Sequence, residues 1–315
     1  MKALKTLLAC GVAVLMLFSL MPYMPALSFQ LIDLPSHFVV QYALAVAVLL
    51  PATGFLKMPK TAVTLLCVLL LNFWQLYPQL MPMPAPATTG KPLKILQANT
   101  LYFTKNFDAF KALVAAEKPD LIVGSETNHE LGQVLKTLEK DYPHQAVHTQ
   151  GDNPRGLALL SKIPFTRQDK AYYDHAKIPS QVFTIEHEGQ KIRFVSVHPS
   201  TPMTVEGLES RDNIFKNLFK KMEKENPDNL VVLGDFNATP WCPALKKLTV
   251  DLDLTNSRNG KGLMPTWHTA FPGALFRIPI DHVLVSKKLA AVTHRLGPEI
   301  GSDHLPSIVE IAFKK

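Results

Sequence analysis

The distribution of apolar residues divides the chain near residue 80. Before that point, residues 6–32, 38–56 and 61–80 form three stretches without a charged side chain. Each is close to the ~20 residues that a helix needs to cross a ~30 Å hydrocarbon core. We therefore expect a membrane anchor of about three transmembrane helices over residues 1–80. A signal peptide followed by a buried helical hairpin is the alternative, but it leaves two further membrane-length stretches to explain.

After residue 94 the pattern changes to short apolar runs that alternate with helical periodicity. A proline-rich segment, residues 81–91, separates the two halves and is typical of a semi-stiff linker. Helices lie between some strands while other strands follow one another directly, which predicts a two-sheet sandwich with outer helices over residues 92–315. The expected strands cover residues 95–99, 120–126, 156–161, 182–186, 192–198, 230–237, 280–286 and 308–313, and the expected helices cover residues 107–117, 130–138 and 205–224.

The most informative run reads L-V-V-L-G-D-F-N over residues 230–237. Its β-branched valines and its glycine favour a buried strand over a helix. Side chains two apart in a strand share a face, so Asp235 and Asn237 point the same way. Such a pair can bind a hard cation or a phosphoryl oxygen. A strand end that enters an ordinary Asx turn is the alternative.

Other expected strands also end in residues that chemistry can use. Taken singly, each of these is an ordinary turn or cap residue, but aligned strands would gather them into one polar cluster. Carboxylates gathered in this way repel one another unless a cation neutralises them. Oxygen ligands such as Glu126 and Asp303 favour Mg²⁺ or Mn²⁺ over Zn²⁺. The strand-end residues are Asn99, Glu126, His198, Asp235 with Asn237, Asp281 with His282, and Asp303 with His304.

Charge gives the expected orientation of the anchor. Residues 1–90 hold four Lys and one Asp, which leaves +4 of the net charge of +7 to the remaining residues. That surplus fits an anionic substrate but is below the basic footprint of a nucleic-acid binder. The lysines lie at positions 2, 5, 57 and 60, so the positive-inside rule places both clusters in the cytoplasm and the domain on the opposite side. The isolated Cys10, Cys67 and Cys242 predict no disulfide framework.

Six short motifs resemble the endonuclease/exonuclease/phosphatase superfamily, a group that includes DNase I, AP endonucleases, neutral sphingomyelinases and inositol-polyphosphate 5-phosphatases. The resemblance covers about residues 92–313, and it implies a DNase I-like four-layer α/β sandwich and a metal-dependent phosphodiesterase or nuclease-type hydrolase (EC 3.1). The family often has L-Q-E where this chain has G-S-E, so Glu126 is kept and the preceding glutamine is not. The motifs are Q-A-N (97–99), G-S-E-T (124–127), S-V-H-P (196–199), G-D-F-N (234–237), I-D-H-V-L-V-S (280–286) and G-S-D-H-L-P (301–306).

The resemblance implies a metal site and a water-activating site. Glu126 is then the main Mg²⁺ (or Mn²⁺) ligand, with Asn99 beside it to orient metal or phosphate. Asp303 matches a second metal ligand or a partner in catalysis. Asp235 aligns or deprotonates the attacking water, and Asn237 holds a phosphoryl oxygen.

The resemblance also implies roles for the histidines. His304 contacts the phosphate as an acid or an electrostatic clamp, Asp281 fixes its tautomer, and His198 donates to the phosphate or the leaving oxygen. Arg155 and Trp267 are candidate substrate-binding residues, for a phosphate and for a base or sugar. The simpler interpretations are that Arg155 is a solvated loop charge and that Trp267 is an aromatic residue of the core or its rim.

We therefore expect a Mg²⁺-dependent phosphodiesterase, multi-pass in the inner (plasma) membrane, with its catalytic domain on the periplasmic or extracytoplasmic side. Its expected partners are the lipid bilayer and a phosphodiester of nucleic acid, lipid or envelope, without an obligate protein partner. The alternatives are a nuclease specific for DNA, a phospholipid or sphingomyelin phosphodiesterase, and a non-enzymatic membrane protein with an accessory domain. The three apolar stretches contain no ionisable residue of the kind that marks a transport pathway.

Overall fold

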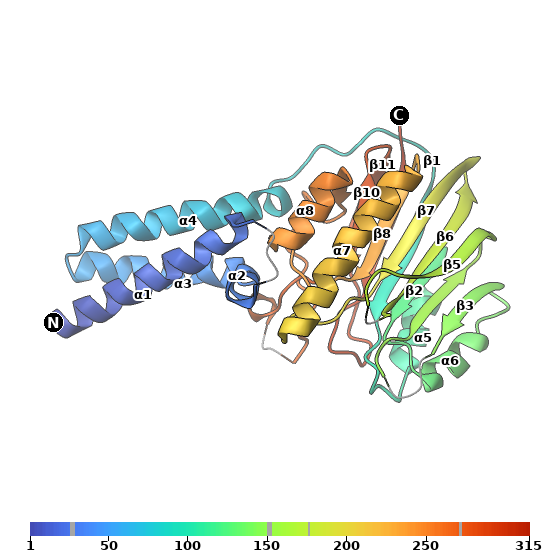
Figure 1. Cartoon of the computed structure of the whole chain (residues 1–315), viewed down its shortest axis with the longest axis horizontal. Helices are drawn as coiled ribbons and strands as arrows, with labels where there is room; N and C mark the ends of the chain where they lie inside the picture. The colour runs from blue at the N-terminus through green and yellow to red at the C-terminus, as the bar shows by residue number, and fades with distance from the viewer. Residues whose placement is uncertain (26–28, 150–152, 176, 271–272) are drawn as a thin grey trace.

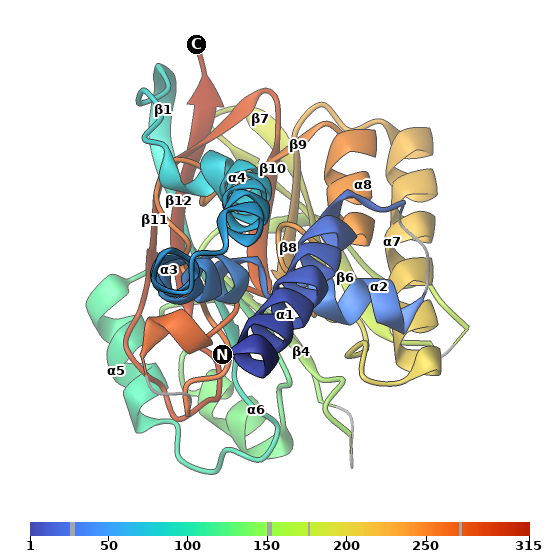
Figure 2. The ribbon, with the colours of Figure 1, turned by 90° about the vertical axis from the view of Figure 1, so that its left-hand side faces the viewer.

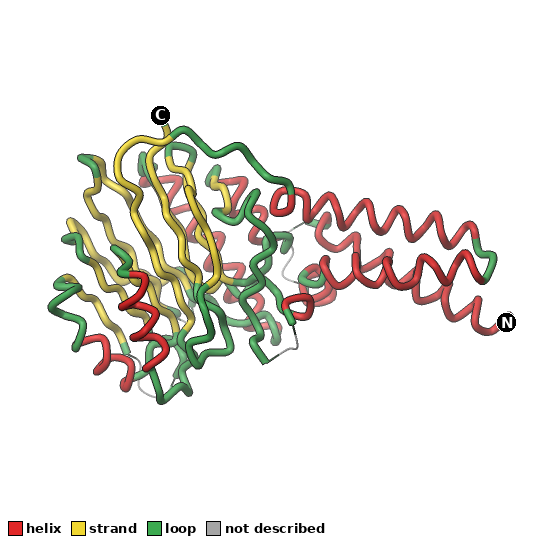
Figure 3. The backbone as a smooth tube through the Cα atoms, turned by 180° about the vertical axis from the view of Figure 1, so that it is seen from behind, coloured by secondary structure: helices red, strands yellow, loops and turns green. Residues whose placement is uncertain are grey.

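A bundle of apolar helices projects from a two-sheet domain, with the N-terminus at the far end of the bundle (Figures 1 and 3). The computed structural model describes residues 1–25, 29–149, 153–175, 177–270 and 273–315. The helices of the anchor are α1 (Lys2–Leu20), η1 (Met21–Tyr23), α2 (Gln30–Ser36), α3 (Val39–Phe55) and α4 (Pro59–Leu80).

Two helical segments of the described chain, Lys2–Tyr23 and Pro59–Leu80, are long and apolar enough to cross a membrane. The pair α2 and α3 passes the same test together, but it is bent by 67°, so two segments, or three if the bent pair is one span, are long and apolar enough to cross a membrane. The first apolar stretch was expected to continue to residue 32, whereas its helix ends at Tyr23. Pro22 starts the final 3-10 turn, and proline cannot supply the amide hydrogen that a continuing helix needs. The separate helix α2 is consequently available to pack on the domain.

The domain contains two sheets of six described strands that pack face to face. Their shared core includes Leu93 and Val123 from the first sheet and Phe194 and Leu233 from the second. The first sheet has the order β11 (Leu289–Leu296), β12 (Ser307–Lys314), β1 (Thr88–Asn99), β2 (Leu121–Ser125), β4 (Leu157–Ser161) and β3 (His144–His148). The second has the order β5 (Phe165–Tyr172), β6 (Pro179–His187), β7 (Gln190–Val197), β8 (Leu230–Asp235), β10 (Asp281–Ser286) and β9 (Leu254–Asn256).

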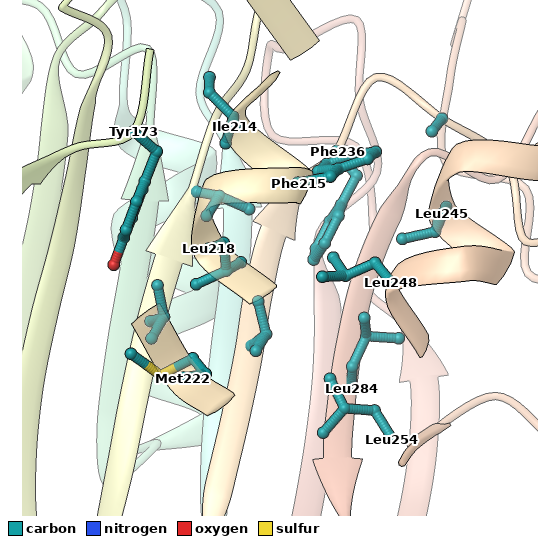
Figure 4. Packing of buried hydrophobic residues seen from close by; sticks show 14 of the residues in the cluster. Tyr173, Ile214, Phe215, Leu218, Met222, Phe236, Leu245, Leu248, Leu254 and Leu284 are labelled. Atoms are coloured by element: carbon teal, nitrogen blue, oxygen red, sulfur yellow. The ribbon is translucent and has the colours of Figure 1, made fainter. Parts of the chain in front are cut away.

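Helices cover both outer faces, which completes the four-layer α/β sandwich. On the first sheet, the apolar faces of α5 (Asp108–Glu117) and α6 (His129–Lys136) pack over β1, β2, β4 and β12. On the second, α7 (Val205–Glu225) and α8 (Pro243–Asp251) pack over β7, β8 and β10. Figure 4 shows this layer, with Leu218 of α7 and Leu248 of α8 directed at the sheet beside Phe236. The two-sheet sandwich with outer helices expected from the periodicity and the four-layer fold implied by the resemblance are confirmed, although α8 was not among the expected helices.

The differences from expectation lie at the margins of the sheets. Strand β1 begins at Thr88, inside the segment expected to be a linker, and a register shift between Thr89 and Leu93 accommodates Pro92. The strands that the sequence did not predict are β3, β5, β9 and β11, which are the four edge strands. An edge strand has a neighbour on one side only, so it carries polar residues and lacks the continuous apolar run of a central strand.

Candidate active site

The candidate active site lies where the carboxyl ends of four central strands meet the start of β10. The pairs β1–β2 and β7–β8 are parallel, so each pair ends at the same edge of its sheet. Strand β10 runs antiparallel to β8, and its first residue, Asp281, pairs with Asp235. This topology brings together residues separated by almost two hundred positions in the chain.

The loops that follow these strands require unusual backbone conformations. Gly234 has φ +135°, and a Cβ there would lie 2.0 Å from the carbonyl oxygen of Val197, so only glycine fits. Glu126 and Asn237 adopt the left-handed region, with φ of 57° and 48°. Backbone strain of this kind concentrates at functional sites, where the surrounding structure fixes it.

Asn99 connects two carboxylates of the site, those of Glu126 and Asp235. Its Nδ2 donates to Glu126 Oε1 at 2.9 Å and to Asp235 Oδ2 at 3.1 Å. The backbone N–H of Tyr102 donates to Glu126 Oε2 at 3.0 Å. His198 completes the cluster, with Nε2 3.7 Å from Glu126 Oε1 and 3.6 Å from Asp235 Oδ2.

A buried histidine–carboxylate pair adjoins this cluster. His304 Nδ1 lies 2.8 Å from Asp281 Oδ2, and its Nε2 lies 3.7 Å from Asp235 Oδ2. Because the Asp281 carboxylate accepts at Nδ1, the His304 Nε2 faces Asp235. Gln97 Nε2 donates to the other Asp281 oxygen at 2.8 Å. The pair is thus held from both sides, with Asp281 fully buried and His304 4% exposed.

Burial and neighbouring charge shift the pKa values of these groups in opposite directions. Burial raises the pKa of Asp235 to about 6; the Asp281 charge adds to this effect, and the charges of His304 and His198 oppose it. Burial alone would lower the pKa of His304, but the charges of Asp281 and Asp235 raise it to about 10. Burial also opposes ionisation of Asp281, yet His304 and the hydrogen-bond donors around it hold its pKa below the usual value. At neutral pH the site therefore holds an imidazolium beside a carboxylate.

The remaining predicted residues lie around this centre. Asp303 Oδ2 accepts from Trp267 Nε1 at 3.0 Å, and its Oδ1 lies 4.0 Å from His304 Nε2. Trp267 thus positions a carboxylate that borders the site. Half-buried Arg155 precedes Gly156, whose carbonyl accepts from the backbone N–H of Thr127 at 3.2 Å, beside the Glu126 loop. The substrate-binding roles of Arg155 and Trp267 stay predictions.

The donor set fits a divalent cation at Glu126. Ligand atoms of Glu126, His198 and Asp235 lie within 4.8 Å of one another, as a bound ion requires. Glu126 is also the less buried carboxylate of the cluster, and its two oxygens are fixed by Asn99 and Tyr102. As Asn99 lies, its amide nitrogen faces the carboxylates and its Oδ1 accepts from the backbone N–H of Leu101 at 3.0 Å. In this orientation Asn99 orients Glu126, and its role as a direct ligand stays a prediction.

A sequence model of the Endonuclease/Exonuclease/phosphatase family matches residues 96–304. The chain belongs to the endonuclease/exonuclease/phosphatase family. Members of this family are hydrolases that act on phosphodiesters or phosphate esters, and they usually use a divalent metal. No curated protein matches the chain.

Solved structures share the fold at low sequence identity. An endonuclease/exonuclease/phosphatase from Beutenbergia cavernae has a TM-score of 0.61 and 17% identity, over 71% of this chain and 72% of that one. The human Nocturnin catalytic domain with bound sulfate has a TM-score of 0.56 and 18% identity, over 72% and 97% of the two chains. D. rerio TDP2 complexed with a single-stranded DNA product has a TM-score of 0.59 and 13% identity, over 70% and 99%. At these sequence identities, the structural similarity establishes only the fold of the chain.

Sequence reasoning missed several residues that position the site of this family member. Ser302 Oγ donates to the carbonyl of Asn99 at 2.8 Å and accepts from the backbone N–H of His304 at 3.1 Å. Buried Arg258 donates to the Asp281 carbonyl. Gln97 and Ser302 stand inside the Q-A-N and G-S-D-H motifs, so proximity to a motif was the available signal. Arg258 lies outside every motif, and the sequence holds no signal for it.

Proposed function

We propose that the chain is a membrane-anchored, Mg²⁺-dependent phosphodiesterase that hydrolyses its substrate by attack of water. One observation carries the proposal: Asp235 Oδ2 lies between two histidines, 3.6 Å from His198 Nε2 and 3.7 Å from His304 Nε2, and shares the Asn99 amide with Glu126. A proton acceptor, two proton donors and a cation-binding carboxylate are thereby within reach of one phosphodiester.

The residues divide the reaction between them. Asp235, with its pKa raised to about 6, accepts a proton from water as the water oxygen bonds to phosphorus. The His304 imidazolium, held by Asp281, offers Nε2–H to a phosphoryl oxygen and stabilises its growing charge. His198 Nε2–H donates a hydrogen bond to the leaving oxygen, which takes up a proton from solvent water as its bond to phosphorus breaks, giving an alcohol and a phosphomonoester. When bound at Glu126, Mg²⁺ supplies Lewis-acid and templating chemistry.

The pH dependence follows from the two shifted groups. The proposed mechanism needs Asp235 ionised and His304 protonated, so kcat/KM is expected to rise with pH through about 6 and to fall through about 10. The profile is measured between pH 4.5 and 10.5 with bis-p-nitrophenyl phosphate at the lowest Mg²⁺ concentration that supports turnover. A bound cation beside Asp235 favours its ionised form, so saturating Mg²⁺ is expected to move the acid limb to lower pH. An activity that is constant from pH 5 to 7 contradicts the base assigned at Asp235.

Removal of metal is expected to abolish turnover. Lewis-acid stabilisation amounts to several kcal/mol, so EDTA is expected to lower kcat at least ~10²-fold, with recovery on adding Mg²⁺ or Mn²⁺. The assay uses the full chain in nanodiscs and bis-p-nitrophenyl phosphate. Undiminished hydrolysis after exhaustive chelation excludes the proposed metal dependence.

The contacts of α2 support a domain on the extracytoplasmic side. The segment after the first span packs against the domain that follows the last span, through bonds such as Gln30 Nε2 to the carbonyl of Pro202 at 3.2 Å. Helix α2 and the domain must then lie on the same side of the bilayer. Three crossings give this arrangement, because the chain leaves the first span and the third span on the same side. Lys2, Lys5, Lys57 and Lys60 fall on the other side, in agreement with the positive-inside rule.

Exposed apolar residues near the anchor favour a lipid phosphodiester over DNA as the substrate. Met203, on the loop that begins at His198, and Val205, the first residue of α7, follow the Pro202 carbonyl that contacts Gln30, and they are 71% and 52% exposed. Leu275 and Phe276 are 52% and 59% exposed, and the Leu275 carbonyl accepts from Gln41 Nε2 at 2.9 Å. Apolar side chains beside a membrane anchor suit the boundary between headgroups and acyl chains.

A substrate panel separates the two candidates. The full chain with Mg²⁺ is tested on phospholipid in mixed micelles, plasmid DNA, and an oligonucleotide with an abasic site. Turnover of phospholipid at least tenfold above DNA is expected. Cleavage of DNA without lipid turnover decides for a nuclease, an activity in keeping with the DNA product bound to D. rerio TDP2.

A further inference from the structure

The membrane anchor is seated firmly on the catalytic domain. Trp241, 1% exposed, packs with Val39, Val40 and Leu76 of the anchor helices. The backbone N–H groups of Gly260 and Gly262 donate to the carbonyls of Pro78 and Gln79, at 2.8 and 2.9 Å. Short helix α2 lies at the end of the anchor next to the domain (Figures 1 and 2). The ionisable side chains of Asp33 in α2 and of the C-cap residue His37 enter the domain behind the G-D-F-N loop.

The first of these side chains, Asp33, pairs with Arg211 of α7. Arg211 NH2 donates to Asp33 Oδ1 at 2.6 Å, and NH1 donates to Oδ2 at 3.1 Å, so the pair is bidentate. Arg211 is fully buried and Asp33 is 3% exposed. The same NH1 donates to the backbone carbonyl of Asn237 at 3.3 Å. The carboxylate of the anchor therefore fixes the guanidinium that holds the backbone of a proposed phosphoryl-binding residue.

The second side chain, His37, contacts the same loop by another route. The backbone N–H of Thr239 donates to His37 Nδ1 at 3.2 Å, and its hydroxyl lies 3.1 Å from the same nitrogen. Because Nδ1 accepts, His37 carries its proton on Nε2, which lies 3.2 Å from Asp33 Oδ2. Asp33 thus connects to residues 237 and 239 through two different partners.

A metal ion is the competing interpretation of this cluster, since ligand atoms of Asp33, His37 and Cys242 lie within 4.8 Å of one another. Both carboxylate oxygens of Asp33 already accept from Arg211, and a cation there would face a buried guanidinium. Cys242 Sγ lies 3.3 Å from Asp33 Oδ1, and burial raises the pKa of this thiol to about 12, so it remains protonated and donates to Asp33. The charges favour an ion pair over a metal site.

We propose that Asp33 is a positioning residue for the active site, through which the seating of the membrane anchor sets the conformation of the loop that carries Asp235 and Asn237. The proposal rests on the proposed phosphodiesterase function for its kinetic readout. In this proposal the membrane anchor holds the domain at the membrane and also contributes to the conformation of the active site.

The test compares full-length variants in nanodiscs. Asp33→Asn keeps the shape of the side chain and removes one of the two carboxylate charges that hold Arg211, while the pair with Asp212 remains. We expect kcat for bis-p-nitrophenyl phosphate to fall at least ~10-fold per folded molecule, since misplacing catalytic groups by about 1 Å lowers the rate by as much as ~10²-fold. The assay temperature is kept well below the thermal unfolding midpoint of each variant. Lys246→Gln is the matched control, because the described hydrogen bonds of Lys246 Nζ go to the anchor, at the carbonyl of Pro22 (2.8 Å) and at Gln75 Oε1 (3.3 Å). Its kcat is expected to stay within twofold of the parent.

Two further measurements separate positioning from a general loss of stability. In a double-mutant cycle with Arg211→Gln, the double variant is expected to lose less activity than the product of the two single losses, because Asp33 acts on the loop through Arg211. Hydrogen exchange is expected to accelerate in the peptide covering residues 235–242 of Asp33→Asn while the β1 peptide is unchanged. Hydrogen exchange does not depend on turnover, so it tests the positioning role even if the parent chain shows no phosphodiesterase activity. An inactive parent chain refutes the proposed function and leaves the exchange test of Asp33 intact. An Asp33→Asn variant with parental kcat and parental exchange over residues 235–242 overturns the inference, as does strict multiplication of the two single losses.

Discussion

Replacing His304 with alanine is expected to lower kcat at least ~10²-fold while the domain remains folded, since a positioned acid or base contributes ~10²–10⁴-fold. The physical reason is the loss of the side chain that joins Asp281 to Asp235: its Nδ1 lies 2.8 Å from one carboxylate and its Nε2 lies 3.7 Å from the other. The measurement is kcat and KM for bis-p-nitrophenyl phosphate, with the thermal unfolding midpoint recorded on the same sample.

Stability must be separated from chemistry in this variant. Removing one member of a buried charge pair costs about 3–5 kcal/mol, although Gln97 still donates to the abandoned Asp281. His304→Gln keeps a hydrogen-bond donor for Asp281 without an imidazole, so it is expected to recover stability but not activity. His187→Ala, which alters a histidine at the far end of β6, serves as the control. Near-parental kcat in folded His304→Ala would falsify the role given to His304.

Glu126→Gln is expected to lower kcat/KM at least ~10²-fold at millimolar Mg²⁺, with partial recovery at higher concentrations. Glu126 is the carboxylate whose oxygens are pre-oriented by Asn99 Nδ2 and by the backbone N–H of Tyr102. The amide of Gln keeps one oxygen but removes the negative charge that attracts a hard cation. The shift appears in the Mg²⁺ activation curve and independently in Mn²⁺ titration calorimetry.

The control for this second variant is Glu130→Gln, a charge in the first turn of α6 and four residues along the chain. It is expected to leave the Mg²⁺ activation curve in place. If Glu126→Gln keeps both parental activity and parental metal affinity, the cation binds elsewhere and the metal role of Glu126 is wrong.

The seating of the anchor bears on how the domain is best studied. A fragment that begins after the proline-rich segment lacks Asp33, so buried Arg211 loses its bidentate partner. The same fragment lacks the helices that pack on Trp241, so this side chain becomes exposed. Low activity of such a fragment is then expected even if the complete chain is an efficient enzyme. For this reason every experiment above uses the full chain.

The sequence by itself determined the central strands, the outer helices except α8, and the residues at the strand ends. These depend on local information: an apolar run such as residues 230–233 has to be buried, and the polar residue that ends it has to lie at an edge of the sheet. The same reasoning gave the apolar helices of the anchor. It did not find the edge strands, because a strand with one neighbour has no such run.

Only the tertiary structure decided which strand ends meet. Parallel pairing of β7 with β8 and antiparallel pairing of β8 with β10 bring Asp281 opposite Asp235, and no local pattern encodes that register. The same holds for Asp33, a lone acid between two apolar stretches whose partner lies 178 positions away. Long-range contacts of this kind arise from packing of the whole chain, so their residues carry no signal until the fold places them side by side.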